Sequence, residues 1–140
     1  MNEQERITVA AIRALAALEA RHKSFMTHIA SESDLGVNGG TVTAGDGKLT
    51  VTTLGVTTVA NCRPIAVDGI PVAMEYSFTT PFKGEETPIW RLYLDQSGTL
   101  HEDSAFSNRF GDYNGTYFRS NIVVALANKL LMSPVFAPSA

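Results

Sequence analysis

Two stretches in the middle of the chain alternate between apolar and polar residues with a period of two. These are Val72–Thr79 and Ile89–Asp95, and the tight turn Asp68-Gly69 precedes the first of them. Such alternation is typical of a half-buried strand, because successive side chains point to opposite faces of a sheet. The second stretch carries Trp90, the single tryptophan of the chain. We therefore expect the core to form on these two strands, with Trp90 and Phe78 on the same face.

The N-terminal part of the chain has a different period, with apolar residues at steps of three and four. This spacing predicts one long helix over residues 3–31, with Asn2 as its N-cap and Asp34-Leu35-Gly36 as its expected end. At ~1.5 Å per residue the helix would be about 40 Å long, which is longer than a small sheet is wide. The apolar stripe consists of Ile7, Ala11, Ala14, Leu18, Phe25 and Ile29, and further apolar residues lie off it at Val9, Ile12, Ala16 and Met26. Because one sheet cannot cover so wide an apolar arc, we expect a second partner for this helix.

Thr-rich, β-prone segments occupy residues 41–60 and predict strands at Thr41–Thr43 and Lys48–Leu54, followed by a third strand from Val56 toward Val67. The turn Asp68-Gly69 then fixes a register for the next hairpin. The expected cross-strand pairs are Val67 with Ile70, Ala66 with Pro71, Ile65 with Val72, and Pro64 with Ala73. In this register both prolines fall where the missing N–H is tolerated, and Pro64 is expected to face a sheet edge or an unpaired stretch.

The remaining connections are expected to be longer and less regular. Thr80–Pro88 contains two prolines and a glycine and is interpreted as a loop too long for a tight turn. Thr99–His101 can form a short strand, and residues 102–118 show no strong period. Ser120 is the expected cap of a final helix near Asn121–Met132, and residues 133–140 are expected to form a loose tail.

This order of elements predicts a single α+β domain over residues 1–140. A long N-terminal helix packs on an antiparallel meander sheet of five to six strands, and a C-terminal helix follows. In outline alone the order resembles cystatin-like and NTF2-like folds, and an analogy at the level of the fold implies no function.

Composition narrows the class of protein. A chain of 140 residues with 44% apolar residues is typical of one globular domain. The formal net charge of −3 argues against nucleic-acid binding, which needs a basic surface. A single cysteine favours a reducing compartment. No run approaches the ~18 apolar residues of a transmembrane helix. Glu3 and Glu5 stand where a secretory signal would carry Lys or Arg. We therefore expect a soluble, cytoplasmic protein without a membrane segment.

The best candidate site is the aperiodic segment 102–118, because loops of this length in compact domains are often functional. Its three phenylalanines (Phe106, Phe110 and Phe118) are expected to point inward, with the tyrosines half-exposed beside arginines, a combination favoured at binding surfaces. The alternative is a loop that plugs the core and turns its polar residues to water. The candidate binding residues are His101, Arg109, Asp112, Tyr113, Tyr117 and Arg119.

Other chemistry-bearing residues carry weaker signals. Cys62 could act as a nucleophile only with a base beside it, and is more simply a small apolar strand residue. His22 and His28 lie six residues apart, so a helix turns them to different sides and they cannot bind one metal together. His101 and the nearby carboxylates match no recognised spacing of metal ligands. We expect no metal and no cofactor.

Two functions remain open on this basis. The first is a non-enzymatic protein-interaction domain that binds a protein partner or itself, most simply as a homodimer. The second is a small-molecule-binding protein or an enzyme whose pocket lies between the helix and the sheet. Tyr76 and Trp90 would line that pocket, together with His101, Arg109 and Tyr113. A deep pocket with convergent polar groups would favour the second function, and a filled core with exposed apolar surface would favour the first.

Overall fold

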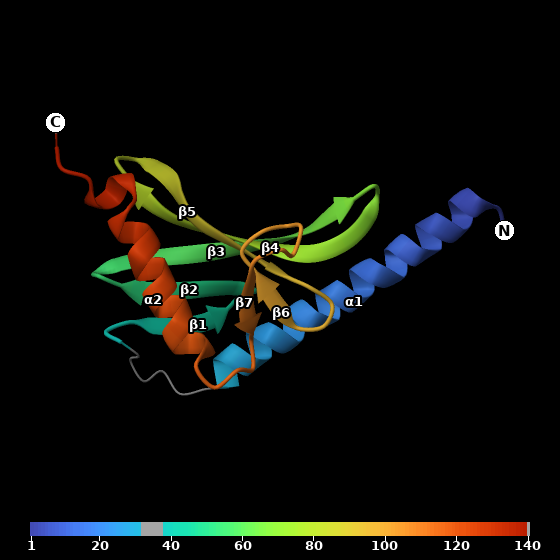
Figure 1. The fold of residues 1–140 in the computed structure, drawn as a ribbon, viewed down its shortest axis with the longest axis horizontal. Coiled ribbons are helices and arrows are strands. Elements are labelled where there is room, and N and C mark those ends of the chain that lie inside the picture. Colours follow the sequence, from blue (N-terminus) through green and yellow to red (C-terminus); the bar gives the residue numbers. More distant parts are fainter. Residues whose placement is uncertain (32–37, 140) are drawn as a thin grey trace.

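The computed structural model describes residues 1–31 and 38–139. It has an N-terminal helix, a curled antiparallel meander of seven strands and a second helix, so the α+β fold is confirmed with slightly more strands than expected (Figure 1). The elements in chain order are α1 (Glu3–Ser31), β1 (Thr41–Gly45), β2 (Lys48–Thr53), β3 (Val56–Val67), β4 (Ile70–Phe82), β5 (Glu85–Leu94), β6 (Thr99–His101), β7 (Arg109–Asp112) and α2 (Phe118–Leu131), followed by a 3₁₀ turn at Pro134–Phe136.

The first helix spans the range that its apolar period predicts. The Asn2 side-chain oxygen accepts the main-chain N–H of Glu5 at 2.8 Å, which confirms the N-cap. Glu3 and Glu5 in the first turn also suit the positive end of the helix dipole. The expected stop signal, Asp34-Leu35-Gly36, lies outside the described residues.

The C-terminal half of α1 lies against the sheet, and the N-terminal half extends beyond it (Figure 1). Leu18, Phe25 and Ile29 of α1 are buried and belong to one core cluster with residues of the sheet and of α2. On the sheet, Phe78 and Trp90 are cross-strand neighbours with ring centroids 5.5 Å apart, and both are buried. The prediction that these two rings share the core face is confirmed.

The β3–β4 hairpin turns at Asp68-Gly69, where both residues have positive φ (52° and 78°), as a type I′ turn requires. The first two predicted pairs, Val67 with Ile70 and Ala66 with Pro71, are correct. Positive φ is costly for most residues, so glycine suits the second turn position.

The register prediction fails beyond those two pairs. Ile65 lies opposite Ala73, and Pro64 lies opposite Met74. The cause is a β-bulge, in which β4 carries one extra residue and all later pairs shift by one. The expectation for Pro64 is nevertheless confirmed, because β2 pairs with β3 only as far as Ala60, so β2 leaves Pro64 without a partner on its side of β3.

The expected long loop Thr80–Pro88 is wrong. β4 continues to Phe82 and β5 starts at Glu85, so the connection is the two-residue turn Lys83-Gly84 with φ of 51° and 79°. This is again a type I′ turn, which matches the twist of the strands that it joins. Pro81 and Pro88 both keep pairing partners, since a strand tolerates proline where the missing N–H faces away from its neighbour. A β-bulge at Ile89 follows Pro88 and shifts the later pairs by one residue.

The segment 102–118 is also more regular than expected, because Arg109–Asp112 forms β7 beside β6. The second helix begins at Phe118, so Ser120 is not its cap. The Ser120 hydroxyl instead accepts a hydrogen bond from the side-chain amide of Asn38. This bond ties the start of α2 to the segment that leads into β1.

Candidate functional site

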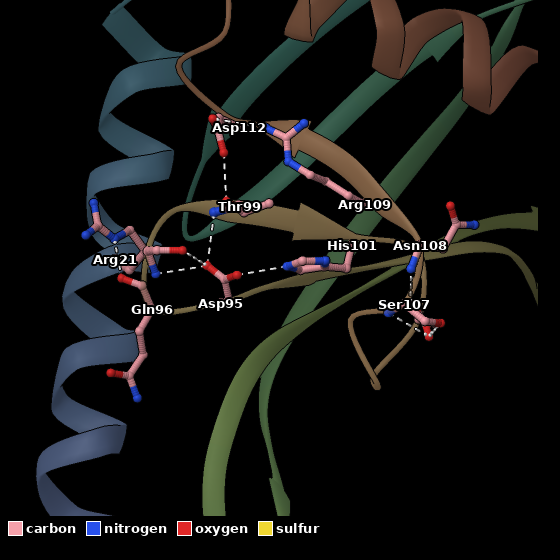
Figure 2. A network of polar contacts seen from close by, with 11 residues as sticks. Arg21, Asp95, Gln96, Thr99, His101, Ser107, Asn108, Arg109 and Asp112 are labelled. Atoms are coloured by element: carbon pink, nitrogen blue, oxygen red, sulfur yellow. Dashed lines mark hydrogen bonds and ion pairs between the residues drawn. The ribbon is translucent and has the colours of Figure 1, made fainter.

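His101 is buried on β6 and is held by Asp95 at the end of β5, with 2.8 Å between His101 Nε2 and Asp95 Oδ2 (Figure 2). The same carboxylate accepts the main-chain N–H groups of Ser97 and Thr99. Burial alone would raise the pKa of Asp95, but these hydrogen bonds outweigh it, and the pKa is lowered. Asp95 is therefore ionised at neutral pH and fixes both the turn and the imidazole.

Phe106 covers His101. The two rings are stacked with centroids 4.4 Å apart, and Phe106 remains 36% exposed. The expectation that Phe106 points into the core is therefore wrong, because its ring packs on the imidazole instead. Phe118 is buried as expected, and Phe110 is partly buried against Trp90.

Three of the predicted binding residues lie at the surface. Arg109 and Asp112, at the two ends of β7, form an exposed ion pair with 3.2 Å between Arg109 Nη2 and Asp112 Oδ2. Asp112 also accepts the Thr99 hydroxyl at 2.7 Å (Figure 2). Tyr117 precedes α2 and is 73% exposed. Exposed ion pairs of this kind contribute little to the free energy of unfolding, so the fold does not depend on the pairing of Arg109 with Asp112.

Tyr113 and Arg119 point inward and join elements of the fold. Tyr113 is only 9% exposed and packs on Phe25, so the expectation of a half-exposed ring is wrong. Arg119 donates to the carbonyl oxygens of Ile29 and Val42, which connects α2 to the end of α1 and to β1. The predicted set therefore divides into an inward-pointing pair (Tyr113 and Arg119), an exposed group and the separate His101 site.

The space between α1 and the sheet is filled by side chains. Tyr76 is fully buried, and its hydroxyl lies 2.7 Å from His22 Nδ1. Trp90 is 8% exposed, and its Nε1–H donates to Glu102 at 3.3 Å. Tyr76 and Trp90 therefore act as core residues, and Trp90 alone of the two reaches an outer groove.

That groove has a volume of about 830 Å³ and lies between β5 and the segment that follows β6. Strand residues form one side, and polar loop residues with one lysine of α2 form the other. Of its β5 side the sequence predicted only Trp90 as a pocket residue, although exposed charges and a proline within a strand could have marked the rest as an edge. The lining residues include Glu86, Pro88, Arg91, Glu102, Asp103 and Lys129.

Two further features bear on chemistry. Burial raises the pKa of the Cys62 thiol to about 11, so this sulfur is protonated at neutral pH. Among residues 1–31 and 38–139, no three His, Cys, Asp or Glu side chains come together in a way that could hold a metal ion.

Apolar side chains are exposed on α1, at the β3–β4 turn, and on α2 and the residues that follow it, at Val124, Leu131 and Met132. On α1, Ile7 is 41% exposed and Ile12 is 63% exposed, and at the β3–β4 turn Val67 and Ile70 are 52% and 41% exposed. None of the helices in the described part of the chain is long and apolar enough to cross a membrane.

Comparisons with known proteins add no identification. No protein-family model, curated protein or solved structure matches this chain significantly.

Proposed function

We propose that this protein is a non-enzymatic protein-interaction domain that self-associates through the N-terminal half of α1. The observation that carries the proposal is an apolar helix segment without a covering layer. Ile12 is 63% exposed and Ile7 is 41% exposed, whereas Leu18 on the same helix is fully buried. Burying an isoleucine side chain is worth about 1.5–3 kcal/mol, so a partner that covers this segment gains free energy.

The charges of the segment favour a second copy in antiparallel orientation. The first turn of α1 is acidic at Glu3 and Glu5, and Arg13 follows two turns later. An antiparallel pair of helices centred on Val9 places Glu5 of each copy opposite Arg13 of the other. Ile12 lies on the same side of α1 as Val9 and faces this pair, whereas Ile7 lies about 140° around the helix from Ile12 and stays outside it. Such pairing joins opposite charges beside an apolar centre, as in antiparallel coiled coils. A closed two-fold arrangement of this kind is the commonest form of homo-oligomer.

The protonated thiol of Cys62 and the filled interior around Tyr76 support a non-enzymatic role over an enzyme with a pocket between helix and sheet. The free thiol is also consistent with the cytoplasmic location that we propose. The formal net charge of −3 supports a protein partner over a nucleic acid.

Light scattering over a range of concentrations tests the self-association. The wild-type protein should reach twice the monomer mass, and Ile12→Glu should stay monomeric because a buried, unpaired charge opposes association. Val124→Glu on α2 is the matched control, since Val124 is an exposed apolar helix residue with 54% exposure. This control should dimerise like the wild type.

A charge exchange tests the orientation. Glu5→Arg alone should weaken the dimer, because it brings two arginines together, and the double variant Glu5→Arg with Arg13→Glu should restore it. A wild-type protein that remains monomeric at high concentration would overturn the proposal. Equal weakening by Ile12→Glu and Val124→Glu would show that the interface lies elsewhere.

A further inference from the structure

β5 has main-chain groups without a strand partner along most of its length. β4 pairs with β5 from Glu85 to Leu94, whereas β6 pairs only with Tyr93 and Leu94. Within the described residues, segment 85–92 therefore has a neighbouring strand on one side alone. The N–H and C=O groups of alternate residues point to opposite sides of a regular strand, and β5 keeps this alternation on either side of a β-bulge at Ile89. Alternate residues before and after the bulge therefore face the open side.

The direction of Arg91 follows from the neighbouring turn. The N–H of Asp95 bonds to the carbonyl oxygen of Thr99 at 3.0 Å, on the β6 side of β5. Counting back in steps of two, Tyr93 and Arg91 turn their main-chain groups to the same side. β6 ends at His101, opposite Tyr93. The main-chain groups of Arg91 thus lie beyond the last pair and face the open side.

The outer groove runs beside this open edge and extends over β4 at Ser77 and Thr79. Its opposite wall comes from the segment after β6 and from Lys129 of α2. Its volume of about 830 Å³ is within the range that holds drug-sized ligands, which is enough for a short piece of extended chain. The β5 residues that line it are Glu86, Pro88, Ile89, Trp90, Arg91 and Tyr93.

The opposite wall is held in place by its own hydrogen bonds. The Asp103 carboxylate accepts the main-chain N–H groups of Ser107 at 3.0 Å and of Asn108 at 2.9 Å. The N–H of Glu102 bonds to the carbonyl oxygen of Asn108 at 2.8 Å, and Trp90 donates to the Glu102 side chain. A wall that is already ordered loses little conformational entropy when a ligand binds.

The β1 edge of the sheet is occupied in comparison. α1 packs along β1, and the guanidinium group of Arg119 donates to the carbonyl oxygen of Val42. A peptide that added to β1 would have to displace this side chain. α2 packs against β5 as well, but among the described residues no side chain hydrogen-bonds to the main-chain groups of residues 85–92. The β5 edge is therefore the better template for an added strand.

The charges around the groove select the kind of peptide. Glu86, Glu102 and Asp103 outnumber Arg91 and Lys129 in the lining, which favours a basic ligand. An exposed charge and a proline on the β5 edge also oppose its pairing with the same edge of another copy. We propose that this groove binds an extended, basic segment of a partner protein, which adds as a strand to the open edge of β5.

Peptide binding measured by fluorescence anisotropy tests this site. The probes are short synthetic peptides of alternating Lys and Val, their Glu and Val counterparts, and a Lys–Val peptide that is N-methylated on every second amide. The Lys–Val peptide should bind at least about tenfold more tightly than the Glu–Val peptide. The N-methylated peptide should not bind, because it has lost the main-chain donors for β5. Hydrogen exchange of the Arg91 amide should slow by about tenfold or more in the complex.

A matched pair of variants locates the binding. Glu86→Lys should weaken binding of the Lys–Val peptide by about tenfold, and Glu19→Lys, the same charge change at an exposed position on α1, should not change it. Failure of the Lys–Val peptide to bind, or equal binding of its N-methylated form, would overturn the proposal. Protection of the Arg91 amide in the protein alone, rising with concentration, would also overturn it, because the occupant of the edge would then be a second copy.

Discussion

The two halves of α1 have the same apolar period and different surroundings. In the C-terminal half, the side chains of Phe25 and Ile29 are at most 1% exposed and belong to the core cluster. In the N-terminal half, Ile7 continues the same stripe but is 41% exposed, because the sheet ends before the helix does (Figure 1). The difference shows that an amphipathic pattern specifies a helix and its buried face without specifying what covers that face. Where the pattern extends beyond the protein's own core, the unpaired part is available to a partner.

The largest expected effect that distinguishes the two halves is on stability. Phe25→Ala should lower the free energy of unfolding by about 3–5 kcal/mol, since it leaves a cavity in a filled core. Phe25 is fully buried and contacts the rings of Tyr76, Tyr113 and Phe118. Urea unfolding at dilute protein concentration gives the measurement.

Ile7→Ala is the matched comparison at the other end of the stripe. It should change the free energy of unfolding of the monomer by about 0.5 kcal/mol or less, as for other surface substitutions. A large loss for Ile7→Ala in dilute solution would mean that the N-terminal half is part of the core. The comparison between the two halves would then be wrong.

The features that the sequence predicts well are those with a local physical cause. The extent of α1 follows from the apolar period and from the cap at Asn2. The position of Phe78 and Trp90 on the same face of the sheet follows from strand alternation. The Asp68-Gly69 turn follows from the residues that positive φ favours. These causes act within a few residues or between adjacent strands, so a single sequence contains them.

The features that the sequence misses depend on distant or subtle geometry. The bulge that shifts Ile65 from Val72 to Ala73 leaves no mark in the pattern. The prolines around Lys83-Gly84 suggest a loop, although that pair is itself a good type I′ turn. The fold alone decides whether a proline faces a neighbour or an open edge.

The candidate site was harder to predict for a related reason. Tyr113 and Arg119 have the chemistry of binding residues, but the fold turns them toward Phe25 and toward main-chain carbonyls. The open edge of β5 exists because β6 ends opposite Tyr93, and that length is a property of the assembled sheet. Chemistry can be read from residue types, whereas direction and exposure come from tertiary structure.

A smaller effect is expected at His22, in the C-terminal half of α1, whose side chain lies against the sheet. Burial lowers the pKa of His22 below its ordinary value of 6.5, and Nδ1 lies 2.7 Å from the Tyr76 hydroxyl. Below pH 6.5 the unfolded chain therefore binds more protons than the folded protein does at this residue. The contribution of His22 to stability is fully present above that pH and is lost as the pH falls through the lowered pKa of the folded protein.

Urea unfolding near neutral pH and at about one unit below the ordinary histidine pKa measures this contribution. The variant is His22→Gln, whose amide oxygen can still accept a hydrogen bond from Tyr76. The loss of stability on acidification should be smaller in the variant than in the wild type. If both lose the same free energy, then the burial of His22 in the structure has no consequence for its titration, and other groups cause the acid sensitivity.

The smallest expected effect on global stability is that of Asn2→Ala, although the same change should have a clear local effect. Loss of an N-cap costs a helix about 0.5–2 kcal/mol. Because the N-terminal half of α1 is largely exposed, its first turns can open while Phe25 and the sheet stay folded, so the cost is local fraying. The midpoint of urea unfolding should hardly move, while the amides of the first turns exchange faster by about tenfold. A shift of the midpoint by the full cost of the cap would show that the whole helix unfolds as one unit with the core. The same exchange measurement at high protein concentration also tests the proposed dimer. Pairing with a second copy should slow amide exchange in the first turns of the wild-type helix and suppress the fraying of Asn2→Ala.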